Sequence, residues 1–185
     1  VGFQGWLHHR AMVVGETYAA EHRLDATRVE ALPQPLSPFN WMVVIPQRDA
    51  YEVAYVSLWR NAAPEAPPAG SSWLNQVSAS YYPPTLAAWK QVSRFGPTET
   101  MMVEQLWQSD TFAAFRAFAE FPAVYRVDRK KDSLCVWFND LRFALAGRNM
   151  PFRYGACQNG TDTVWRIYRL LNDDNGQEIA DALTR

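Results

Sequence analysis

Proline placement constrains this chain more than any other feature, because a proline inside a helix or a central strand removes a backbone hydrogen bond. Residues 1–32 contain none of the 12 prolines, and Pro33, Pro35 and Pro38 follow directly. The proline-free segment is rich in Ala, Glu, Arg, Met and Leu, which favour helix. We therefore predict one long helix over residues 1–32 that ends at the proline cluster.

The first seven residues of this helix differ from the rest of it. Residues 1–7 (VGFQGWL) are apolar and aromatic, whereas His8, His9 and Arg10 begin a stretch that carries many charged side chains. An aromatic residue followed by basic residues is typical of a helix that leaves a bilayer at the level of the lipid headgroups. An ordinary amphipathic helix explains the same pattern equally well, so both interpretations stay open here.

Strand-like segments separated by polar turns predict three antiparallel hairpins. The paired segments are 40–45 with 51–60, 123–128 with 134–143, and 152–157 with 163–171. Segments 51–60 and 134–143 are apolar on both faces, which indicates a sheet that is covered on both sides. We expect helices on one side, and loops, a partner or a membrane surface on the other.

Further helices are expected in the middle of the chain. Pro83-Pro84 can begin a helix over 85–95, a second includes 99–107, and a third follows a cap at Ser109 or Asp110. Residues 172–185 are expected to form a frayed polar end with a short helix.

These elements define the predicted fold. It is α+β, with an antiparallel sheet of about six strands, three or four helices and a long N-terminal helix. Residues 1–32 form that helix, and residues 33–185 form a single α+β domain.

Composition excludes some classes of function. Lys and Arg number 18 and Asp and Glu number 19 among 185 residues, so the net charge is −1 and charge alone would not hold nucleic acid. At 48% hydrophobic residues the chain can bury a sizeable core. No run of about 18 apolar residues is present, so no complete membrane span is expected within it.

Catalytic and metal-binding motifs are also missing. The chain has no P-loop, GxGxxG, GxSxG or HExxH motif, and all three histidines fall on the predicted first helix. His9 and His22 would lie about 20 Å apart along its axis, too far to share a metal. Cys135 and Cys157 lack metal-site spacing and are either a disulfide or two small buried residues.

Six polar and aromatic residues are candidates for binding. Asp140 and Arg142 fall on one strand face, where an ion pair would either pin the strand end or anchor a ligand in a cleft. Aromatic residues around the Pro-Pro corner would either pack in the core or line an apolar groove. These are Tyr81, Tyr82 and Trp89, and Trp41 is added from the proline-rich segment. The basic turn Arg129–Lys131 is expected to be a solvated loop tip or an anionic-lipid contact.

The order of several segments is similar to that of a known family. The segments are a proline-rich strap (Leu32–Trp41) leading to Val43-Val44, a Tyr-rich strand (Tyr51–Trp59), Trp89–Phe95, and a strand ending Asp140-Leu-Arg-Phe143. Together they resemble the C-terminal soluble region of the bacterial membrane-bound metal-dependent hydrolase family. The resemblance covers nearly the whole chain, and the strap and the Asp-Leu-Arg-Phe strand are its most specific parts.

The resemblance implies a parent protein in the bacterial inner membrane, on a side that the sequence does not assign. Its N-terminal helices would carry the His and Asp motifs that bind a divalent metal. None of those motifs occurs here, so no catalytic or metal-binding residue and no cofactor is expected in this chain. Residues 1–7 would be the end of a truncated membrane helix.

The implied function is that of a non-catalytic extramembrane domain. It would cover the membrane-embedded N-terminal part of the same protein, select substrate or bind a partner, with a lipid or small molecule as a further ligand and no nucleic acid. The alternative is a stand-alone binding module for an apolar or lipid-like ligand.

Overall fold

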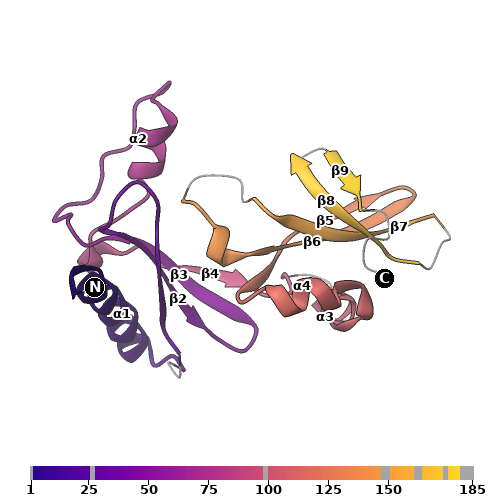
Figure 1. Ribbon diagram of the computed structural model, residues 1–185, viewed down its shortest axis with the longest axis horizontal. Coiled ribbons are helices and arrows are strands. Elements are labelled where there is room, and N and C mark those ends of the chain that lie inside the picture. Colours follow the sequence, from indigo (N-terminus) through magenta and orange to yellow (C-terminus); the bar gives the residue numbers. More distant parts are fainter. Residues whose placement is uncertain are drawn as a thin grey trace. The chain divides into compact units, whose positions relative to one another are not determined.

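The structure, a computed structural model, describes residues 2–25, 28–97, 100–146, 151–160, 164–172 and 175–179. The chain divides into two compact units, Val1–Val92 with Leu145–Asn149, and Ser93–Ala144 with Met150–Arg185 (Figure 1). The sequence predicted a single domain over 33–185. Each unit contains its own sheet.

Both sheets are antiparallel, and the fold class is α+β as predicted. The first sheet has the order β1-β2-β3-β4 and the second has the order β5-β6-β7-β8-β9. The strands of the first sheet are β1 (Glu30–Pro33), β2 (Asn40–Pro46), β3 (Ala50–Ser57) and β4 (Lys90–Ser93). Those of the second are β5 (Pro122–Lys130), β6 (Ser133–Asp140), β7 (Arg153–Asn159), β8 (Arg166–Asn172) and β9 (Asn175–Glu178).

The prediction of one sheet with about six strands was wrong in its strand count. All three expected hairpins are present, as β2–β3, β5–β6 and β7–β8. The three additional strands are β1, β4 and β9, which have four residues each and lie at the edges of their sheets. Strand β4 replaces the helix expected over 85–95, where only a 3₁₀ turn at Pro84–Leu86 is helical. Strand β9 lies where a short helix was expected, and residues 180–185 lie outside the described residues.

The described residues contain four α-helices: α1 (Gly2–His22), α2 (Trp73–Ser78), α3 (Thr100–Gln108) and α4 (Ala113–Phe118). Short 3₁₀ turns precede α4, at Asp110–Phe112, and follow β6, at Leu141–Phe143. None of the helices in this described part has the length and apolar character needed to cross a membrane.

Helix α1 ends ten residues earlier than the proline pattern predicts. Arg23 adopts a left-handed backbone conformation, with φ of 54°. Its N–H donates to the carbonyl of Ala20, and the N–H of Leu24 donates to that of Ala19, 2.9 Å away. This is the hydrogen-bond pattern of a Schellman motif, which satisfies the last carbonyls of a helix. Glycine usually occupies this left-handed position, so the arginine found there does not indicate the end of a helix in the sequence.

Small residues on α1 allow the helix to approach the first sheet closely, as Figure 1 shows for α1 beside β2. Leu7, Ala11, Gly15 and Ala19 recur every four residues and are its buried positions. They pack against a core that includes Trp41, Val43 and Ile45 of β2 and Ala54 and Val56 of β3. At Gly15 the approach is so close that an added Cβ would lie 2.5 Å from Cγ1 of Val29 and 2.8 Å from Cγ1 of Val43.

The second unit places its helices on one face of the second sheet. Trp107 of α3 contacts Phe138 of β6, with ring centroids 4.9 Å apart, and Phe112 contacts the same ring at 5.0 Å. Val136 and Ala156 belong to the same core. The opposite face of this sheet carries the groove described below.

Replacement of Gly15 by alanine tests the close contact of α1. We expect Gly15→Ala to lower the free energy of unfolding by about 1–3 kcal/mol, because its methyl group would overlap Val29 and Val43. Gly5→Ala is the matched control: it lies on the same helix with nothing within 4 Å of its added Cβ. Helix propensity should make this control neutral or up to about 1 kcal/mol more stable. Urea unfolding followed by circular dichroism measures both, and equal stability of the two variants would contradict the packing.

Candidate functional site

Two of the six candidate residues, Trp41 and Tyr81, are core residues of the first unit. Trp41 is buried between α1 and the sheet, and its Nε1 donates to the carbonyl of Pro38, 3.1 Å away. Tyr81 is fully buried, and its hydroxyl donates to Oε1 of Gln34. Burial raises the pKa of Tyr81 to about 12, so this phenol stays protonated and remains a hydrogen-bond donor.

The other two aromatic candidates lie at the edge of this core. The backbone of Tyr82 pairs with β3: its N–H donates to the carbonyl of Tyr55, and its carbonyl accepts from Ser57. Trp89 stacks on Tyr18 of α1, with centroids 4.0 Å apart and planes 13° apart. Trp89 and Trp41 both contribute to the core under α1, whereas Tyr81 belongs to a separate cluster with Val77. The structure therefore does not bring the four aromatic candidates together around one cleft.

Asp140 and Arg142 form the expected pair and pin the end of β6. The Asp140 carboxylate is 1% exposed and accepts hydrogen bonds from the backbone N–H groups of Glu120, Phe121 and Arg142. Arg142 donates to it from Nε at 2.8 Å and from Nη2 at 2.6 Å, and Nη2 also donates to the carbonyl of Phe118. The hydrogen bond to Asp140 raises the pKa of Arg142. The pair thus joins the 3₁₀ turn after β6 to the segment between α4 and β5.

Loss of the Asp140 charge should destabilise this junction. We expect Asp140→Asn to lower the free energy of unfolding by about 3 kcal/mol, because Arg142 loses its counter-charge. In addition, the NH₂ group of the asparagine would face backbone N–H groups that now donate to the carboxylate, so two donors would oppose each other. Asp49→Asn, in the exposed turn before β3, should change it by less than about 0.5 kcal/mol. Thermal and urea unfolding of both variants measure the difference. A loss that is equally small in both would show that the buried carboxylate is not required.

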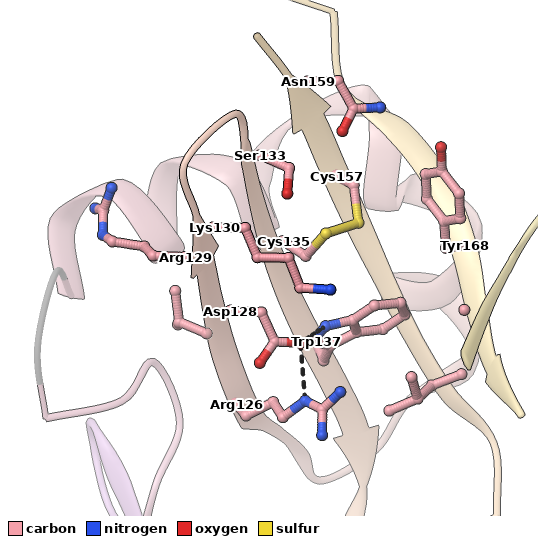
Figure 2. A pocket seen from close by; sticks show the side chains of 13 residues that line it. Arg126, Asp128, Arg129, Lys130, Ser133, Cys135, Trp137, Cys157, Asn159 and Tyr168 are labelled. Carbon is pink, nitrogen blue, oxygen red and sulfur yellow. Dashed lines mark hydrogen bonds and ion pairs between the residues drawn. A yellow bond between two sulfur atoms is a disulfide. The ribbon is translucent and has the colours of Figure 1, made fainter. Parts of the chain in front are cut away.

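A groove lies on the face of the second sheet that the helices leave open (Figure 2). Its volume is about 650 Å³, within the range of small-molecule sites. Residues of five strands line it, among them Arg126, Asp128, Lys130, Ser133, Cys135, Trp137, Cys157, Asn159 and Tyr168. The sequence did not predict this site, because only the strand register brings these side chains to one face.

A disulfide and a tryptophan form the floor of the groove. Cys135 of β6 and Cys157 of β7 lie directly opposite each other and are bonded, which decides between the two alternatives left open by the sequence. The indole of Trp137 lies over Gly155, where an added Cβ would overlap it, and reaches Gly176 of β9. Its Nε1 donates to Oδ2 of Asp128, 2.8 Å away. The floor is therefore held by a covalent bond and by a hydrogen bond.

An exposed aromatic surface occurs on the first unit. We define it as Phe3 and Trp6 of α1, Phe39 of the strap and Trp59, which follows β3. Consecutive ring centroids are 6.3 Å apart for Trp6 and Phe3, 6.1 Å for Phe3 and Phe39, and 5.1 Å for Phe39 and Trp59. Phe3 is 58% exposed, Trp6 51% and Trp59 73%. The guanidinium of Arg10 lies 5.2 Å from the Trp6 ring.

The described residues do not gather a metal site. No group of three or more His, Cys, Asp or Glu side chains in this part of the chain could hold a metal ion. His8 instead contacts Trp41, and Nδ1 of His22 hydrogen-bonds the carbonyl of Tyr18.

Comparison of the chain with protein-family models, with curated proteins and with solved structures finds no match in any of the three. The family resemblance noted from the sequence therefore stays a prediction.

Proposed function

We propose that this chain is the extramembrane C-terminal domain of a bacterial inner-membrane protein of the metal-dependent hydrolase family. In this proposal the domain is not catalytic: it covers the membrane-embedded part, selects substrate or binds a partner. The metal and its ligands would belong to the N-terminal part of that protein. The order of sequence segments supports the family, and one surface of the first unit supports its place beside a membrane.

The aromatic surface is the observation that carries the proposal. Single exposed apolar side chains are common on protein surfaces and need no explanation. Several that contact one another form a patch, and such patches mark interaction sites. Tryptophan is favoured at the membrane–water interface because its ring is apolar and its N–H is polar. Trp6 lies near the first described residue of α1, and the basic side chain of Arg10 stacks over it. Arg10 can reach lipid phosphates while the rings enter the region of the headgroups.

Binding to vesicles tests this contact. We expect the chain to co-sediment with vesicles of phosphatidylethanolamine and phosphatidylglycerol, and the double variant Trp6→Ser/Trp59→Ser to bind at least about tenfold more weakly, a loss of about 1.4 kcal/mol. Trp73→Ser is the matched control, because Trp73 is 50% exposed on α2 of the same unit and has no place in the aromatic surface. Absence of wild-type binding, or an equal loss in the control, would contradict a membrane-facing role for this surface.

The reading frame upstream of Val1 tests the family assignment separately. We expect it to encode a series of apolar helices that carry His and Asp motifs. A signal peptide directly before Val1 would contradict the proposal, and sequencing of the genomic region decides between the two.

A further inference from the structure

Three polar side chains form a row across one end of the groove. Lys130 of β5 lies opposite Ser133 of β6, and Ser133 lies opposite Asn159 of β7. Residues opposite one another in adjacent antiparallel strands point to the same face, with Cβ atoms about 5 Å apart. The three residues are therefore side by side, and their ammonium, hydroxyl and amide groups can all donate hydrogen bonds. Such a row suits an acceptor with several oxygen atoms.

The charge within the groove is positive at this end. Asp128 already accepts hydrogen bonds from Nε of Arg126, 2.9 Å away, and from Nε1 of Trp137. That pair brings one positive and one negative charge together. Lys130 forms no ion pair with any residue that the structure describes, and it is exposed. In Figure 2 its side chain extends from β5 toward the middle of the groove. An anion would complement this remaining charge.

The rest of the groove offers a preformed surface on which a planar ring can lie. Beside the polar row lies the disulfide between Cys135 and Cys157, and Tyr168 of β8 lines the far wall. The hydroxyl of Tyr168 donates to Glu178 of β9, 3.0 Å away, which holds that ring at the wall. Burial and this hydrogen bond raise the pKa of Tyr168, so its hydroxyl stays protonated and remains a donor to Glu178. Preformed walls reduce the entropy that binding a small ligand costs.

We propose that the groove binds a small organic anion, a carboxylate or a phosphate attached to a ring. The acid group lies on Lys130, Ser133 and Asn159, and the ring covers the disulfide beside Tyr168. This site is independent of the aromatic surface, which belongs to the first unit.

Phenyl phosphate is a suitable probe, with inorganic phosphate and phenol as its two halves. In ¹H–¹⁵N NMR spectra of the full chain, we expect saturable shifts at Lys130, Ser133 and Asn159 and at the Trp137 indole N–H. Inorganic phosphate should bind more weakly than phenyl phosphate, and phenol should not bind measurably. Phenol that binds as tightly as phenyl phosphate, or shifts confined to other residues, would overturn the proposal.

Two lysine variants separate recognition from general charge. Lys130→Ala should weaken phenyl phosphate binding by at least about tenfold, as expected for loss of a hydrogen bond to a charged group. Lys131→Ala removes the same charge from the next residue, which is exposed in the turn, and should leave the affinity unchanged. An equal loss in both variants would overturn the site, because it would indicate attraction to a basic turn only.

Benzoate in place of phenyl phosphate identifies the acid group. Tighter binding of benzoate would indicate a carboxylate ligand, and tighter binding of phenyl phosphate would indicate a phosphate. Failure of both probes to bind would overturn the proposal.

Discussion

The close approach of α1 to the first sheet is the contact on which the first unit depends. The buried positions of α1 are mostly small, so the helix itself contributes little apolar area, and the sheet supplies the large side chains. Attraction between closely packed atoms falls off steeply with distance, so this interface is stable only if the backbone of the helix stays near Val29 and Val43. Gly15 is the one position where that approach leaves no room for a side chain.

The contact also fixes the helix along its axis. A shift of α1 by one turn would bring the methyl group of Ala11 or Ala19 to the place of Gly15. That methyl group would overlap Val29 and Val43, as the methyl group of a Gly15→Ala variant would. Helix α1 therefore cannot slide over the sheet without losing its packing. A displacement applied at the N-terminal end of α1 would therefore move the first unit with it.

The sequence predicted the long strands well and the short edge strands not at all. Residues 40–45 and 134–140 have the apolar runs of central strands, and the expected hairpins are present there. Strands β1, β4 and β9 have four residues each, and their sequences (EALP, KQVS and NGQE) lack such a pattern. Pairing with a neighbouring strand determines their structure, and pairing partners are not visible in a local window. The end of α1 was missed for a related reason, because Arg23 adopts a conformation that its residue type does not favour.

The candidate sites show the same contrast. Contacts between residues close in sequence were predictable, and contacts between residues far apart in sequence were not. Spacing along one chain segment correctly paired Asp140 with Arg142, although Arg142 lies in a 3₁₀ turn after the strand. The row of Lys130, Ser133 and Asn159 depends on the register of three strands, and composition had indicated only a basic turn at Arg129–Lys131. Phe39 and Trp59 are also separated in sequence and meet only in the fold. Side chains that only the fold brings together were therefore beyond prediction from one sequence.

The disulfide between β6 and β7 has a consequence for where the chain can mature. It closes a loop with a sequence separation of 22, and a link of this size contributes about 3 kcal/mol to stability. Such bonds persist outside the reducing cytosol. If the domain lies at the inner membrane, as proposed, this bond would favour the periplasmic face over the cytosolic one. On that face the second unit would reach its final stability only after oxidation of the two cysteines.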